Sequence, residues 1–251
     1  MLYKWNLTNI GLPLKVLFTS YLCVVAIGYV MAFTQILFTH GMADGKFGLS
    51  VDDIVYSYYG NRSGTLIENK LDGSMKDKAE DADRFKIIQW VRDGADEETF
   101  KSKGIDQIFE NNCFGCHSAE ADMGLPDFTQ FQNIKERAKE DTGATFSSLT
   151  RVSHIHLFGI SFIFFFVGLI FVMSKSVPAG LKAIAIAMPF ASQIMDIGSW
   201  WLTKFEPIFA WLVIIGGGGM AVAFAFMWTV SMYEMWFMRA DKPVSVKPGD
   251  A

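Results

Sequence analysis

Cysteine and histidine are scarce in this chain, and what is missing narrows the classes of protein to which it can belong. There are three cysteines and four histidines among 251 residues. Three cysteines are too few for a disulfide scaffold. The sequence also has no glycine-rich phosphate loop and no basic patch of the kind that binds nucleic acid, so we expect no nucleic-acid partner.

Charged residues are also few, and apolar residues are abundant. Charged residues make up 19% of the chain and hydrophobic residues 51%, with a mean hydropathy of +0.26. The chain is therefore too apolar for an ordinary soluble domain and too charged to lie in a membrane throughout. We expect one part to be embedded in a membrane and another part to be in water.

Four apolar stretches are long enough to cross a bilayer, which takes about 20 residues of helix. They lie near residues 16–39, 155–174, 181–203 and 207–237. The first is longer than the apolar region of a signal peptide and lacks a clear small-x-small cleavage site, so we interpret it as an uncleaved anchor. Cys23 lies inside this stretch and is expected to be inert packing.

Several basic residues in the short flanks of these stretches share one side. Lysine and arginine near membrane spans are retained on the cytoplasmic side. If there are four spans, one side receives all of the following: Lys4, Lys15, Lys175, Lys182, Arg239, Lys242 and Lys247. The segment from about 40 to 153 then lies on the opposite face, which predicts a bacterial inner (cytoplasmic) membrane protein with this segment in the periplasm.

A short motif, C-F-G-C-H, stands in that periplasmic segment. Its C-x-x-C-H spacing lets the thiols of Cys113 and Cys116 attach covalently to a haem while His117 ligates the iron. A zinc site would need about four N or S ligands, which the segment does not offer. A thioredoxin-like dithiol would need a surrounding β-α-β pattern, which is missing. The motif therefore predicts one covalent haem c, on the face that the flanking charges also predict.

The stretch KIIQWVRDGADEETFKSKGIDQIFENNCFGCHS resembles the haem-attachment region of c-type cytochromes. Members of that family commonly carry an amphipathic helix, with an aromatic residue shortly before the first cysteine. Ile105, Ile108 and Phe109 supply the matching apolar stripe. The resemblance covers about residues 85–130 and says nothing of the membrane helices. It implies a membrane-anchored monohaem cytochrome.

The sixth iron ligand is not evident from the sequence. In many small c-type cytochromes it is a methionine well beyond the motif, but here the second span follows too soon. His154 and His156 at the start of that span are the candidate distal ligands, and because they point about 200° apart on a helix, only one of them is expected to bind the iron. They could instead be interfacial histidines, or serve a metal ion or proton transfer. Other candidates are methionines and a histidine elsewhere in the segment: Met123, Met75, His40 and Met42.

The third and fourth spans contain unusual residues. Asp196 lies within the third span, where an acid is costly and faces protein, water or a partner. It is either a helix-packing carboxylate or a proton acceptor at a quinol site. The four glycines at 216–219 would permit close helix approach or a flat cofactor face, and we favour close approach.

Together these patterns predict an all-α membrane protein with four transmembrane helices and a periplasmic helical cytochrome c domain. We expect an N-terminal anchor (1–39), the cytochrome domain (40–153), a three-helix transmembrane domain (154–237) and a cytoplasmic tail (238–251).

The resemblance implies electron transfer in a respiratory or photosynthetic chain, within a larger membrane complex, since the redox chemistry belongs to the cofactor. One alternative is a quinol-oxidising enzyme with its site at the periplasmic membrane edge, and another is a structural or assembly subunit. We favour an electron-transfer subunit over a stand-alone oxidoreductase. Expected partners are other subunits of the complex and a periplasmic redox protein, with quinone or a haem b as further candidate cofactors.

Overall fold

Every regular element that the structure describes is a helix. The structure is a computed structural model, which describes residues 6–41, 43–44 and 46–239. In these ranges there is no β-strand, and one isolated β-bridge pairs Thr65 with Glu140. The predicted all-α fold is confirmed. Some residues used in the sequence analysis lie outside the described ranges: Lys4, Met42, Lys242, Lys247 and most of the expected tail.

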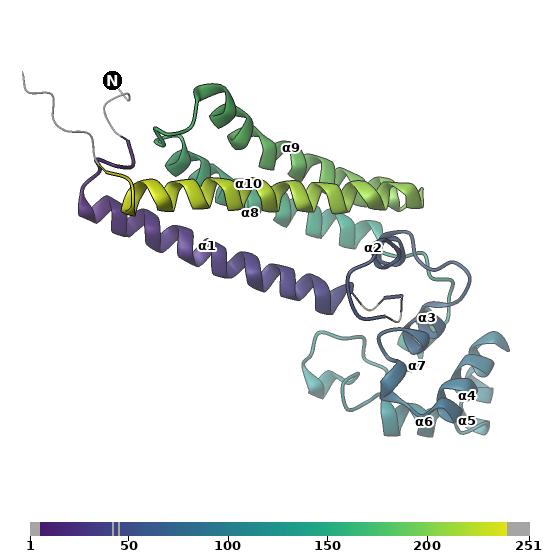
Figure 1. The fold of residues 1–251 in the computed structure, drawn as a ribbon. Coiled ribbons are helices and arrows are strands. Elements are labelled where there is room, and N and C mark those ends of the chain that lie inside the picture. The colour runs from purple at the N-terminus through teal and green to yellow at the C-terminus, as the bar shows by residue number, and fades with distance from the viewer. Residues whose placement is uncertain (1–5, 42, 45, 240–251) are drawn as a thin grey trace, which may run out of the picture. The chain divides into compact units, whose positions relative to one another are not determined.

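Four helices are long and apolar enough to cross a membrane, as predicted (Figure 1). They are α1 (Leu12–Thr39), α8 (Phe146–Phe171), α9 (Ala179–Thr203) and α10 (Ala210–Trp236), the last preceded by the 3₁₀ turn η4 (Pro207–Phe209). Helix α8 begins well before the predicted start of its span near residue 155. The polar residues that precede the apolar run continue the same helix.

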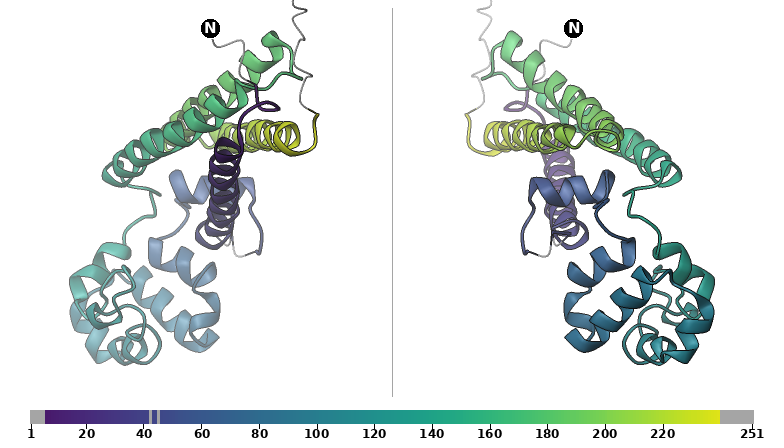
Figure 2. Two further views of the ribbon diagram at one scale, coloured as in Figure 1. Left: turned by 90° about the vertical axis from the view of Figure 1, so that its left-hand side faces the viewer. Right: turned by 90° about the vertical axis from the view of Figure 1, so that its right-hand side faces the viewer.

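Between α1 and α8 the chain forms short helices with loops between them (Figure 2). Capping boxes start α2 and α3, with Ser50 paired to Asp53 and Thr65 paired to Glu68. The elements in order are α2 (Val51–Tyr58), α3 (Leu66–Asp72), η2 (Lys76–Lys78), α4 (Asp81–Arg92), α5 (Glu97–Ser102), α6 (Ile105–Asn112), η3 (Ala119–Ala121) and α7 (Phe131–Arg137).

The chain divides into two compact units, which are described separately below. The first, called the membrane unit, contains α1 up to Phe33, residues 150–199 and the chain from Trp211 onward. The second, called the motif unit, contains residues 34–149 and 200–210.

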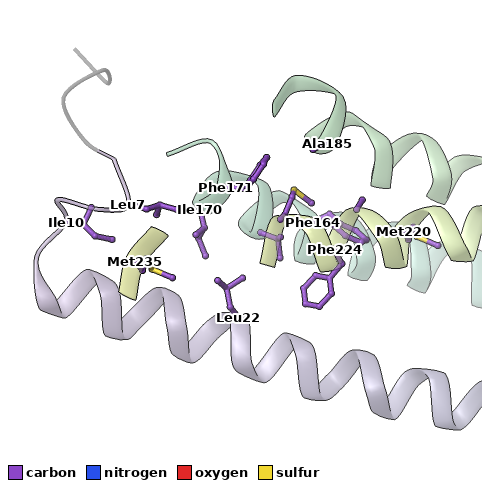
Figure 3. Close-up of a cluster of buried hydrophobic side chains, with 13 residues drawn as sticks. Leu7, Ile10, Leu22, Phe164, Ile170, Phe171, Ala185, Met220, Phe224 and Met235 are labelled. Carbon is purple, nitrogen blue, oxygen red and sulfur yellow. The ribbon is translucent and has the colours of Figure 1, made fainter. Parts of the chain in front are cut away.

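The membrane unit has an apolar core to which all four long helices contribute. Figure 3 shows Leu22 of α1 pointing toward the side chains of the other helices, among them Phe164 of α8 and Phe224 of α10. The Trp228 indole N–H also donates a hydrogen bond to the Leu22 carbonyl, at 3.1 Å. Most other apolar side chains of α1 are exposed, which is typical of a helix that faces lipid.

Two glycines let α9 and α10 approach closely. A Cβ atom added at Gly216 would lie 2.7 Å from the Cβ of Asp196 and 2.9 Å from its backbone nitrogen. At Gly219 an added Cβ would collide with the Ser192 side chain, whereas the two glycines between them face open space. The prediction that this glycine run permits close helix approach is confirmed for these two positions.

Polar contacts tie one end of the membrane unit together. Lys15 at the start of α1 donates a hydrogen bond to the Met235 carbonyl at the end of α10, at 2.5 Å. The buried Glu234 carboxylate accepts hydrogen bonds from the loop between α8 and α9, including one from the Ser174 hydroxyl at 2.5 Å. Lys182 donates to the Ser174 carbonyl in the same region. Lys15 and Lys182, two of the residues used to predict topology, therefore share one end of this unit.

The part of the motif unit between Gly64 and Asp141 begins and ends at one pair of hydrogen-bonded segments, residues 64–66 and 139–141, which we call the neck. The Leu66 amide donates to the Lys139 carbonyl, and the Asp141 amide donates to the Gly64 carbonyl, each at 3.1 Å. The bridge between Thr65 and Glu140 lies between these two hydrogen bonds. The chain that enters this part and the chain that leaves it are thus hydrogen-bonded to each other.

Candidate haem-attachment site

The helix before the motif packs into the apolar core of the motif unit. Ile105, Ile108 and Phe109 of α6 are all buried, which confirms the predicted apolar stripe. They pack with α3, α4 and α5 residues around Trp90 and Phe100. We call this core the Trp90 cluster. It fixes α6, and with it the start of the motif.

The motif forms a helical turn directly after α6. The Cys113 amide donates to the Phe109 carbonyl at 2.8 Å, which extends the helical pattern by one residue. The amides of Cys116 and His117 both donate to the Cys113 carbonyl, at 3.1 and 2.8 Å. Residues three and four apart in such a turn lie on the same side. The two thiols, which are not paired in a disulfide, and the imidazole therefore share one side.

A hydrogen bond determines which nitrogen of His117 is available. Its Nδ1 lies 3.1 Å from the Pro126 carbonyl oxygen. A carbonyl can only accept, so Nδ1 carries the hydrogen and Nε2 keeps a free lone pair. The ring also stacks on Phe128, with centroids 4.4 Å apart and planes at 10°. His117 is thus held in the tautomer and orientation that an iron ligand requires.

The two cysteines have different surroundings. Cys116 is exposed, whereas Cys113 is half-buried and packs against the Trp90 cluster. Burial first, and the neighbouring Cys116 second, raise the pKa of the Cys113 thiol to about 11. A metal-binding cysteine must lose its proton, which this environment opposes. A thioether carries no charge, so burial does not oppose thioether formation in the same way.

These residues fit a covalently held haem. In the described part of the chain, no group of three or more His, Cys, Asp and Glu side chains is placed to hold a metal ion. A porphyrin brings four nitrogens of its own, so His117 alone can complete one face of the iron. The apolar side chain of Leu125 beside the motif is 43% exposed, and a large apolar ring is a group that could cover it.

The two candidate distal histidines lie in the membrane unit, in the third turn of α8. His154 is exposed, and its ring lies at 76° to that of Phe158, with centroids 6.4 Å apart. His156 is half-buried, and its Nδ1 lies 2.9 Å from the Val152 carbonyl. The two thus differ in surroundings, as their spacing predicts. Because they belong to a different unit from His117, their role as iron ligands stays a prediction.

Asp196 and its neighbour Gln193 are buried between the membrane helices. Gln193 donates hydrogen bonds to the carbonyls of His156 and Leu157, at 2.8 and 3.1 Å, and so ties α9 to α8. Asp196 packs beneath Gly216 of α10. These contacts are those of a helix-packing carboxylate, and a role at a quinol site stays a prediction.

Three further candidate ligands among the described residues lie in the motif unit, in different surroundings. Met123 is in the loop that follows the motif, and Met75 is partly buried against the Trp90 cluster. His40 Nδ1 lies 2.7 Å from the Ser57 hydroxyl oxygen. Burial, followed by the charge of Lys70, lowers the pKa of His40.

Two residues of the site were missed by the sequence analysis, namely Pro126 and Phe128. The run Gly124-Leu125-Pro126 does predict a turn. Nothing local, however, indicates that the carbonyl of this proline reaches His117, or that Phe128 covers the imidazole face.

The fold and the membrane unit define an integral membrane protein of the all-α class. A family model named Aq_1264_TM, described as a transmembrane helical domain, matches residues 130–242, which contain α7 to α10. This match does not include the C-x-x-C-H motif. Comparison with curated proteins found no match, and comparison with solved structures found none.

Proposed function

We propose that this protein is a membrane-bound c-type cytochrome that transfers electrons, with one haem attached at Cys113 and Cys116 and ligated by His117. The observation that carries the proposal is the hydrogen bond from His117 Nδ1 to the Pro126 carbonyl, on the same helical turn as two unpaired thiols. The bond frees Nε2 as a ligand beside the two groups that would hold the porphyrin.

Each residue of the site has a separate role in this proposal. The cysteines fix the position of the porphyrin edge, and a bound haem supplies the one-electron redox chemistry. The Pro126 carbonyl orients the imidazole and raises its basicity as a ligand. Phe128 restricts rotation of the His117 ring.

The proposed location is the bacterial inner membrane, with the motif unit in the periplasm. Support comes from Lys15 and Lys182, which lie at one end of the membrane unit, since basic residues are retained on the cytoplasmic side. The three helices after the motif exceed what anchoring requires. We therefore propose a subunit of a larger respiratory or photosynthetic complex that exchanges electrons with a periplasmic redox protein.

Haem staining of denaturing gels tests the attachment. We expect a haem-stained band for the wild-type protein and none for the double variant Cys113→Ala, Cys116→Ala, which should still insert because insertion depends on the apolar helices. Cys23→Ala, in α1, is the matched control and should stain like the wild type. A stained band in the double variant would contradict the proposal.

The alternative that the protein itself oxidises quinol is supported by one observation, a buried acid within a predicted span. Stoichiometric reduction of the purified protein by a quinol analogue, lost in Asp196→Asn with the haem still attached, would favour this alternative. Without direct reduction, electrons must enter through a partner protein.

A further inference from the structure

The loop that follows the motif lies on the side of His117 that faces away from an iron. Pro126 belongs to this loop and accepts the hydrogen bond of Nδ1, whereas iron would bind at Nε2. Met123 is three residues before Pro126 in the same loop, and its side chain is 60% exposed. An exposed side chain in this loop is less firmly held for binding the opposite haem face than a side chain packed in the interior of the motif unit.

Met75 is the described methionine of the motif unit that packs into the protein interior. Its side chain is partly buried against the Trp90 cluster, against which Cys113 also packs. Its amide donates to the Lys70 carbonyl at 2.7 Å, so the connection from α3 to α4 holds it in a defined position. A porphyrin joined to Cys113 would have its edge at this same cluster.

The first turn of α4 links the Met75 segment to the motif helix. Arg84 donates a hydrogen bond to the Leu71 carbonyl, four residues before Met75, at 2.9 Å. One residue earlier, Asp83 accepts a hydrogen bond from Asn112, which directly precedes Cys113, at 3.4 Å. The segment that leads to Met75 and the residue before Cys113 are therefore both hydrogen-bonded to the first turn of α4.

We infer that the Met75 thioether is the sixth ligand of the haem iron, supplied from the part of the chain before the motif. A thioether is neutral and soft, and it can be partly buried without a charge to desolvate. His40, which also precedes the motif, bonds to Ser57 and does not belong to the Trp90 cluster. This inference rests on the proposed haem attachment and assigns the distal position to a methionine rather than to His154 or His156.

Optical spectroscopy of the intact purified protein tests the assignment. The oxidised wild type should show the weak far-red charge-transfer band of methionine-ligated iron. Met75→Leu, which nearly conserves side-chain volume, should keep covalent haem but lose this band, and its reduction potential should fall because thioether ligation raises the potential. The matched control Met123→Leu should keep both the band and the potential.

The outcomes separate this inference from the proposed function. A wild-type protein without covalent haem would overturn the proposed function itself. A haem-bearing wild type without the far-red band, or a Met75→Leu protein that keeps it, would overturn the methionine assignment alone. If Met75→Leu fails to retain haem, the variant Met75→His decides the question. Low-spin haem that lacks the far-red band and has a lower reduction potential would support ligation from position 75. An unchanged spectrum would refute ligation from this position. A changed axial-ligand spectrum in His154→Ala or His156→Ala would return the distal position to a histidine.

Discussion

The two motif cysteines lie three residues apart but differ in how deeply they are buried. Cys113 packs against the Trp90 cluster and has a pKa raised to about 11, whereas Cys116 is exposed. At neutral pH, Cys113 would form about a hundredfold less thiolate than a thiol at the ordinary value of 9.0.

We therefore predict that alkylation of the haem-free protein proceeds in a fixed order. Iodoacetamide should modify Cys116 first and Cys113 much more slowly, because the thiolate is the reacting form and access is also required. Peptide mass spectrometry over a time course would measure both rates. In the haem-bearing protein both residues should resist alkylation, and faster modification of Cys113 in the haem-free form would contradict its burial.

His40 predicts a pH dependence of stability in the motif unit. Its pKa lies below the ordinary value of 6.5, so the unfolded chain binds its proton more readily than the folded one. The contribution of His40 to the unfolding free energy is therefore complete above pH 6.5, and is lost as the pH falls through the lowered folded pKa. Chemical unfolding in detergent at several pH values should show this loss, and His40→Gln should reduce it relative to the wild type.

At the scale of elements, the glycine run 216–219 contains two glycines that contact α9 and two that face open space and can serve as controls. Gly216→Ala would place a Cβ atom 2.9 Å from backbone atoms of Asp196, and overpacking of this kind costs about 1–3 kcal/mol. Gly218→Ala meets open space and should be neutral, or stabilising by up to about 1 kcal/mol, since alanine favours helices over glycine. Thermal unfolding in detergent should show a lowered melting temperature for Gly216→Ala and no lowering for Gly218→Ala, and equal lowering in both would contradict the α9–α10 contact.

The sequence predicts those elements whose signals are local. The four apolar runs and the stripe formed by Ile105, Ile108 and Phe109 are read directly from the order of residues, and the corresponding helices are present. The early start of α8 was missed, because its first turns are polar and become helical in continuity with the apolar turns that follow. Which glycines contact α9 depends on the rotation of α10 about its own axis, and apolar composition around the run does not determine this rotation.

The contacts that orient the side chains of the site could not be predicted from the sequence, because they also depend on how separate segments pack. The C-x-x-C-H spacing predicts His117 as an iron ligand, but the choice of its tautomer depends on Pro126, in a loop with no periodic pattern. The Met75 position likewise follows from the packing of α3, α4 and α6. From sequence alone it was one of several upstream candidates.

At the scale of the whole molecule, the topology predicts where attached reporters work. A reporter domain inserted after Glu140 should be active only if it functions in the periplasm, and one fused after Ala251 only if it functions in the cytoplasm. Four spans and the basic residues at one end of the membrane unit are the basis of this expectation. Paired phosphatase and fluorescent-protein fusions would measure both sites. If both fusions reported the same side of the membrane, this result would contradict an arrangement with three spans between the two fusion sites.

The neck has a consequence for how such a chain could change over evolutionary time. Because Gly64 and Asp141 are joined by a single hydrogen bond of 3.1 Å, the segment between them can be removed and its ends reconnected with a very short link. Insertions are tolerated best where the ends of the inserted part lie close together. The segment that contains the motif is therefore suited to exchange as a unit. A lineage could gain it, lose it or exchange it for another module of similar end spacing, with each transmembrane helix keeping its direction through the membrane.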